Sequence, residues 1–322
     1  MSSVIIAVHG LKNKPPKKLL ARWWKKSILH GFTCAGLTRQ DFPIKMAYWA
    51  DILHGQPLNP YTADPDDPDY LYEPFVRVIP HHSKQTKKLK KQFLTALEKQ
   101  YDRLFLNDDM SLNFSNITES IITRYFSDLA AYYRKEPPPG KKITSKQSIR
   151  KRLVAELQKH RHKDILLLSH SMGSIIAYDV LTLVTPDIKV HTWITFGSPI
   201  GLPVALSHAA QEQKKAGMDG KLSTPENVQN HWFNFSDLDD NVALNWNLVD
   251  DFLPNSRGVH PVDITVTNMY EWQNEPNPHK SFGYLQTAEI AEHIHTFLEE
   301  TSSFLVRLKD RIKIWIKDIF ST

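Results

Sequence analysis

The sequence predicts an α/β fold in which a mostly parallel central sheet is flanked by helices. Short apolar runs at 4–8, 165–168, 189–196 and 231–235 have the length of buried strands, and segments with helical periodicity separate them. Strands that alternate with helices usually lie parallel, because each parallel pairing needs a crossover connection. With 322 residues, of which 41% are hydrophobic, the chain can form one large domain with an insertion, or two domains.

Composition and charge limit the function classes. The single cysteine, Cys34, excludes an internal disulfide and a thiolate metal cluster. The net charge of +5 is concentrated at 12–26, at 84–91 and near the C-terminus. Such clusters are typical of contacts with anionic membranes or nucleic acid, and equally of solvated helix faces. Because only the charge points to nucleic acid, we expect no nucleic-acid partner.

The sequence predicts no targeting or membrane-spanning segment. Its start lacks a basic region, and the first apolar run is too short for a signal peptide. No apolar run approaches the ~18 residues that a transmembrane helix needs. We therefore expect a cytoplasmic or cytoplasm-facing protein.

The first predicted strand, 4–8, runs into a His-Gly-Leu tripeptide. A glycine there lets the backbone turn, so that the N–H of Leu11 can face a ligand. A helix from residue 17 to about 31 and a second strand at 45–50 are expected next. Residues 51–74 are rich in Pro, Asp and Tyr, which is a loop composition, and predict a rim over a site.

Helical periodicity predicts an insertion at 75–140, between a first part of the core at 1–74 and a second part at 141–300. The insertion fits either a lid over a site or a packed helical layer. The tail, 301–322, combines an apolar stripe that includes Trp with basic residues. Such a basic amphipathic helix fits a peripheral membrane contact, a cap on the domain or pairing with a second subunit.

The apolar run 165–168 ends in a tight turn before a helix, which is the arrangement of a nucleophile elbow. The residues two before and two after a nucleophile must be small there, because strand and helix nearly touch. Ser171 meets this condition, since Ser169 and Gly173 flank it. Ser169 as nucleophile would have a leucine on one side, and Ser174 already lies in the helix. Ser169 stands where the commonest pattern, G-x-S-x-G, has glycine.

The remaining core elements follow in order. A helix is expected at 145–160, although Ser145 and Ser148 do not make a full capping box. The segment 207–229 indicates a helix and a loop. A strand at 262–267 and an amphipathic helix at 287–299 complete the core.

A serine hydroxyl needs a base to take its proton and an acid to orient that base. Where a nucleophile elbow of this kind occurs, the three residues follow one another along the sequence in the order serine, acid, histidine. Each lies on a loop at the carboxyl end of a strand. His279 follows the last predicted strand and satisfies this order. Other histidines are rejected because they lie upstream of the serine, before a strand or inside a helix, among them His9, His170, His260, His293 and His295. The acid comes from the aspartates after the 231–235 strand, with Asp240 favoured and Asp239 left open.

These motifs together resemble the α/β-hydrolase superfamily, and more closely its lipase- or esterase-like members. The resemblance rests on strand-His-Gly-Leu, Ser-His-Ser-Met-Gly, Thr-Phe-Gly-Ser-Pro-Ile-Gly, Asn-Phe-Ser-Asp-Leu-Asp-Asp-Asn and Pro-His-Lys-Ser-Phe-Gly. It implies hydrolysis of small-molecule or lipid esters without a metal or organic cofactor. By position, Ser171 is the nucleophile, His279 the base and Asp240 the acid, while Leu11 and Met172 supply the N–H groups of an oxyanion hole. An acyltransferase on the same triad, or a non-catalytic interaction protein, remains the alternative.

Overall fold

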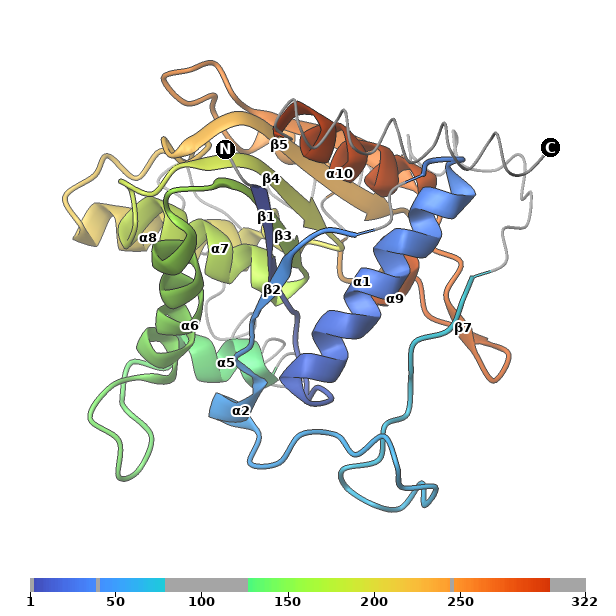
Figure 1. The fold of residues 1–322 in the computed structure, drawn as a ribbon. Helices are drawn as coiled ribbons and strands as arrows, with labels where there is room; N and C mark the ends of the chain where they lie inside the picture. Colours follow the sequence, from blue (N-terminus) through green and yellow to red (C-terminus); the bar gives the residue numbers. More distant parts are fainter. Residues whose placement is uncertain (1–2, 39–40, 79–126, 244–245, 302–322) are drawn as a thin grey trace.

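A computed structural model of the chain describes residues 3–38, 41–78, 127–243 and 246–301 (Figure 1). Within these ranges six strands form one sheet in the order β2-β1-β3-β4-β5-β6, and every neighbouring pair is parallel. The strands are β1 (Ser3–Val8), β2 (Ile44–Ala47), β3 (Asp164–His170), β4 (Val190–Phe196), β5 (Val228–Asp237) and β6 (Pro261–Val266). The predicted fold class is therefore confirmed.

Helices cover both faces of the sheet (Figure 1). On β1 the side chains of Val4, Ile6 and Val8 enter one buried cluster, whereas Ile5 and Ala7 enter the other, as the alternation of a strand requires. The first cluster includes residues of α5 (Ser127–Tyr133), α6 (Ser145–His160), α7 (Met172–Leu183) and α8 (Pro203–Lys215). The second includes residues of α1 (Lys17–Cys34), α9 (Ser281–Tyr284) and α10 (Ala288–Thr301). Both faces of the central strands β1, β3 and β4 are thus almost wholly buried, which explains why these strands are apolar runs in the sequence.

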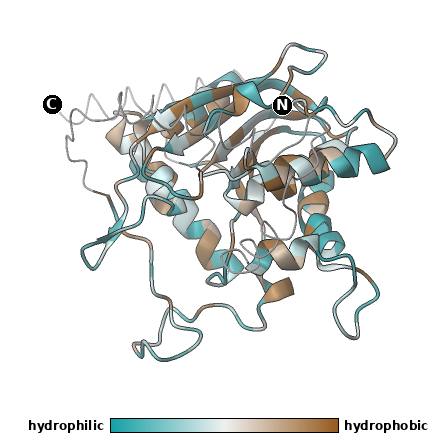
Figure 2. Ribbon diagram, turned by 180° about the vertical axis from the view of Figure 1, so that it is seen from behind, coloured by the Kyte–Doolittle hydropathy of each residue, from teal (hydrophilic) through white to brown (hydrophobic). Residues whose placement is uncertain are grey.

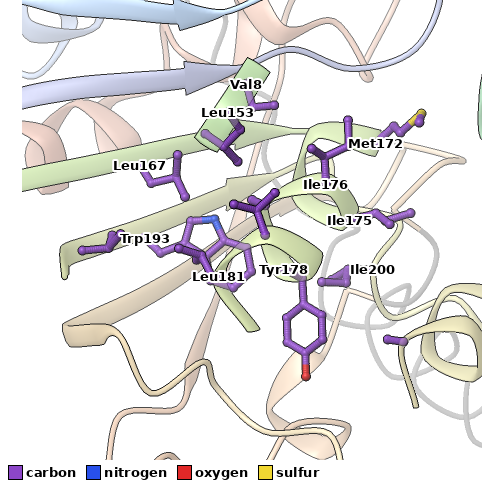
Figure 3. Close-up of a cluster of buried hydrophobic side chains, with 14 of the residues drawn as sticks. Val8, Leu153, Leu167, Met172, Ile175, Ile176, Tyr178, Leu181, Trp193 and Ile200 are labelled. Atoms are coloured by element: carbon purple, nitrogen blue, oxygen red, sulfur yellow. The ribbon is translucent and has the colours of Figure 1, made fainter. Parts of the chain in front are cut away.

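The first cluster includes the buried side chains of α7, the helix that follows the turn after β3, and the strand residues on which α7 packs. Figure 3 shows side chains of α7, among them Ile176 and Leu181, next to Trp193 of β4 and Leu167 of β3. All four are buried. Seen from behind, the outer loops are mostly hydrophilic, whereas the helices carry both hydrophilic and hydrophobic residues (Figure 2). The packing of α7 on this core fixes where the turn before it can lie.

Several local predictions need correction. The second strand is shorter than expected and is followed by the short helix α2 (Ala50–Leu53). Helix α6 does begin with a capping box, formed by Thr144 and Gln147: the Thr144 Oγ1 accepts the N–H of Gln147 at 3.1 Å, and the Gln147 Oε1 accepts the N–H of Thr144 at 3.0 Å. The predicted bounds of this helix are confirmed, but the sequence analysis looked for the capping pair at Ser145 and Ser148, whereas the capping residue is Thr144, one position earlier.

The short elements after β6 were not predicted. They are a hairpin of β7 (Glu271–Trp272) and β8 (Glu275–Pro276), followed by α9. None is long enough to show a periodicity. His279 lies between β8 and α9. The loop that carries it therefore contains more regular secondary structure than the sequence indicated.

Two predicted segments lie largely or wholly outside the described residues. The helical insertion falls mostly at 79–126, and the basic tail at 302–322. From the insertion, α5 is described, and it is tied to the core because the hydroxyl of Tyr132 donates to Asp179 of α7 at 2.6 Å. In the parts of the chain that are described, no helix combines the length and the apolar character needed to cross a bilayer.

Candidate active site

The turn between β3 and α7 is strained at one residue. β3 ends at His170 and α7 begins at Met172, and Ser171 between them has φ 52° and ψ −132°. A non-glycine residue rarely adopts a positive φ, and such strain persists only where the surroundings enforce it. Here the N–H of Ser171 donates to the carbonyl of Phe196 at 3.2 Å, and the hydroxyl of Ser174 donates to the Ser171 carbonyl at 2.7 Å. This is the geometry of a nucleophile elbow.

The residues around the elbow are small because main chains nearly touch there. A Cβ added to Gly173 would lie 2.6 Å from the carbonyl oxygen of Val8 and 2.9 Å from that of His9. Both are backbone atoms of β1 and the turn that follows it, so neither can move without disturbing the sheet. The steric argument made from the sequence for position 173 thus has a definite cause in the structure.

We expect Gly173→Ala to destabilise the protein by about 1–3 kcal/mol or more, because an added methyl group forces the backbone of β1 away from α7. Gly55→Ala is the matched control, since a Cβ there meets nothing within 4 Å. The control should stay within about 0.5 kcal/mol of the unchanged protein. Chemical denaturation followed by circular dichroism measures both, and equal stabilities would show that the close approach is absent.

Three predicted side chains from distant parts of the sequence meet at the carboxyl ends of the strands. The Nε2 of His279 lies 3.0 Å from the Oγ of Ser171. The Nδ1 of the same ring lies 2.8 Å and 3.0 Å from the two carboxylate oxygens of Asp240. With the proton on Nδ1, the ring donates to Asp240 and offers Nε2 as acceptor for the serine hydroxyl. The arrangement can therefore transfer a proton from serine to histidine.

The structure also distinguishes the aspartates that follow β5. The side chain of Asp240 is fully buried, and besides its bonds to the histidine it accepts the N–H of Val242 at 2.9 Å. Asp237 instead accepts the N–H of Asn268 at 2.5 Å and that of Asp239 at 2.9 Å, so it holds the turn together. Asp239 is exposed to solvent. Of these carboxylates, only that of Asp240 contacts the histidine.

Two residues that the sequence analysis did not assign to the site contact the Asp240–His279 pair. The hydroxyl of Tyr284, on α9, donates to Asp240 at 2.8 Å. Burial, followed by the charge of Asp240, raises the pKa of Tyr284 well above its usual value, so it remains a donor. Gly197 has φ 53°, and a Cβ there would lie 3.1 Å from an Asp240 oxygen and 3.2 Å from the His279 Nδ1. The glycine of Thr-Phe-Gly-Ser-Pro thus leaves room for the pair.

His170, rejected as the base from chain order, holds the backbone of His279. Its Nε2 lies 2.9 Å from the carbonyl oxygen of His279, and because a carbonyl only accepts, Nε2 carries the proton. Burial, and then the neighbouring His279, hold the pKa of His170 well below its usual value, so the ring is neutral. The only signal in the sequence was its position beside Ser171 in the elbow.

The predicted oxyanion donors belong to two segments that adjoin the nucleophile. Met172 is the first residue of α7, where a helix leaves its N–H groups without intrahelical partners. A Cβ on Gly10 would lie 3.2 Å from the Ser171 Oγ, so the loop that carries Leu11 passes close to the hydroxyl. The Nδ1–H of His9 donates to the Gly10 carbonyl at 2.9 Å and thereby fixes the peptide plane that contains the Leu11 N–H.

Ser169 has a partner that explains its departure from the commonest pattern. Its hydroxyl accepts the indole N–H of Trp193, on the neighbouring strand β4, at 2.9 Å. Both residues are fully buried. A glycine at this position would leave the indole N–H without that acceptor.

We expect Ser169→Gly to lower the free energy of unfolding by about 1–3 kcal/mol, the cost of one buried unsatisfied donor, even though it restores the commoner motif. In a Trp193→Phe background the same change should cost less, because the donor is already gone. A double-mutant cycle in urea measures the difference. Equal costs in the two backgrounds would mean that the hydrogen bond contributes nothing.

A cavity of about 720 Å³ opens beside these residues. Gly10, Leu11, His170 and His279 line it, together with apolar side chains of α1 and α9. Ser171 itself has no exposed surface, so it lies behind this wall. The volume is within the range of small-molecule sites, roughly 300–1,000 Å³. Among the described residues no three His, Cys, Asp or Glu side chains are grouped to hold a metal ion.

Comparison with known proteins gives one family match. Residues 141–275 match the model of a family described as the PGAP1-like alpha/beta domain. The matched range includes Ser171 and Asp240, and His279 lies just beyond its end. No curated protein and no solved structure matches the chain significantly. The match and the parallel sheet confirm the superfamily recognised from the motifs, and they indicate a hydrolase-type function.

Proposed function

We propose that this chain, with the fold of the α/β-hydrolase superfamily, is a serine hydrolase that cleaves carboxylic esters. The observation that carries the proposal is the continuous contact from the Ser171 Oγ through the His279 ring to Asp240, at 3.0 Å and 2.8 Å. Each member lies at the end of a different strand or in the loop after it, held by bonds to neighbouring backbone. A hydroxyl in such a contact is a nucleophile in neutral water.

The proposed reaction has two steps. The Ser171 Oγ attacks the ester carbonyl carbon while the Nε2 of His279 takes the hydroxyl proton, and the N–H groups of Leu11 and Met172 stabilise the oxyanion. The C–O bond to the alcohol then breaks, and the alcohol leaves with the proton from His279. Water attacks the acyl-enzyme, gives its proton to the same nitrogen, and releases the carboxylic acid and free serine.

Asp240 acts on the base. Its carboxylate holds the His279 Nδ1–H and stabilises the imidazolium that forms in each step. Tyr284 and the N–H of Val242 bind the remaining acceptor positions of this carboxylate. The substrate extends into the cavity, whose walls include Leu20, Trp23 and Phe282. These apolar side chains favour a substrate ester that has an apolar portion, either a small molecule or a lipid.

A fluorophosphonate probe tests the proposal. We expect one phosphonylated residue, located at Ser171 by peptide mass spectrometry, and no adduct on Ser169 or Ser174 in the same peptide. Because Ser171 is fully buried, the surrounding side chains must separate to admit the probe, so labelling is followed over time. Denatured protein is the control. An unlabelled folded protein that also hydrolyses no 4-nitrophenyl ester would indicate a non-catalytic interaction protein instead.

A further inference from the structure

One wall of the cavity is cationic. Lys12 and Lys14, in the loop after β1, and Lys280, next to the proposed base, all line it. Two carboxylates line it as well, those of Glu73 and Asp128. The rest of the lining includes apolar side chains, among them Leu20 and Trp23 of α1 and Phe282 of α9. The charges on this wall therefore face a site that otherwise suits an apolar ligand.

The two carboxylates are already engaged by other groups. Glu73 accepts the Nζ of Lys280 at 2.7 Å and the side-chain amide of Asn277 at 2.7 Å. Asp128 accepts the backbone N–H of Lys12 at 2.6 Å and lies 3.3 Å from the Nε2 of His54. Only one of the three ammonium groups, that of Lys280, is therefore paired with a lining carboxylate.

The remaining two lysines have no carboxylate partner in the described part of the chain. The Nζ of Lys14 contacts the carbonyl oxygens of Leu11 and Lys12 in its own loop. Burial, and then the charge of Lys280, lower the pKa of Lys14 to about 7, as expected where cations crowd one another. The side chain of Lys12 is exposed at the cavity and free to reach a ligand.

We propose that this site selects esters that carry an anionic group, a carboxylate or a phosphate, bound at the wall formed by Lys12 and Lys14. The inference rests on the proposed ester hydrolysis and adds the substrate class. Lys12 contacts the anion directly. Lys14, whose N–H groups point to carbonyls, acts through the charge that it carries when protonated, which is poorly screened where the side chain is partly buried. The apolar part of the same substrate lies against Leu20, Trp23 and Phe282.

Matched esters test this proposal. The carboxylate arm compares 4-acetoxybenzoate with its neutral methyl ester, and the phosphate arm compares 4-acetoxyphenyl phosphate with its neutral dimethyl ester. Each kcat/KM is divided by the rate of spontaneous hydrolysis. We expect at least one anionic ester to be preferred by about 10-fold or more at low salt, with a smaller preference at 0.5 M NaCl. The arm with the larger preference identifies the anion.

Two variants separate the cavity wall from the general positive charge of the protein. Lys12→Gln should lower the preference by about 3- to 10-fold, the effect of one charge at a few ångströms in a partly solvated site. Lys18→Gln removes a charge from an exposed position of α1 outside the cavity lining, and should leave the preference unchanged.

The outcomes distinguish this proposal from the one on which it rests. Turnover of the neutral esters with no preference for either anion would overturn the anionic substrate class and leave ester hydrolysis intact. The same holds if the preference falls equally in both variants. Failure of the protein to hydrolyse any of the four esters, together with absence of fluorophosphonate labelling, would overturn both.

Discussion

Ser171→Ala is expected to lower kcat for ester hydrolysis by about 10⁴-fold or more, because it removes the hydroxyl that lies 3.0 Å from the His279 Nε2. Only the catalysis that comes from substrate binding and the oxyanion donors should remain. Initial rates with 4-nitrophenyl butyrate measure the change, with KM determined separately to show that the substrate still binds.

Ser148→Ala is the control for this substitution. Ser148 lies on α6, and its hydroxyl donates to the carbonyl of Thr144 in the same helix turn. Its removal should leave kcat unchanged. Wild-type rates in Ser171→Ala would rule out the acyl-enzyme mechanism, and loss of activity in both variants would point to a defect of folding that thermal unfolding detects.

Asp240→Asn is expected to lower kcat by about 10⁴-fold, whereas Asp239→Asn should leave it close to the wild-type value. An amide at position 240 can donate to the His279 Nδ1, which favours the tautomer whose Nε2 carries the proton and cannot accept one from Ser171. The ring is hydrogen-bonded to Asp240, whereas Asp239 is exposed to solvent. Both substitutions remove one negative charge, so their difference isolates the contact.

The measurement is kcat with the same ester at several pH values, alongside circular dichroism spectra. If Asp239→Asn proved the more damaging of the two, the turn after β5 would have to adopt another conformation in the active protein. Equal and small effects would mean that the histidine is oriented by other groups. One such group is the Asn277 side chain, whose Oδ1 accepts the backbone N–H of His279 at 3.0 Å.

The sequence was sufficient to predict the fold class and to select the residues that meet in the structure. Ser171 followed from sterics, since only that serine has small neighbours on both sides. His279 followed from chain order. Both arguments depend on local features, namely a strand that ends in a tight turn and a loop that follows a strand, and such features are visible in a single sequence.

The choice between Asp239 and Asp240 was beyond the sequence, because it depends on which of two adjacent side chains turns inward after β5. Tyr284 and Gly197 were missed for a related reason: each meets Asp240 only after the chain has folded across the sheet. The role of the Ser169 hydroxyl was also beyond the sequence, because it depends on how the indole of Trp193, whose register partner is Leu167, reaches Ser169 from the neighbouring strand.

The positive φ of Ser171 implies that the backbone conformation needed to present its hydroxyl lowers the stability of the fold. The strain of such a residue is of order 1–3 kcal/mol, and glycine adopts the same backbone conformation without it. Ser171→Gly should therefore unfold at a higher temperature than Ser171→Ala, even though glycine gives the unfolded chain more freedom, and we expect both variants to be inactive. If Ser171→Gly also unfolded at a higher temperature than the wild-type protein, the side chain proposed as the nucleophile would be held in place at a net cost to the stability of the fold.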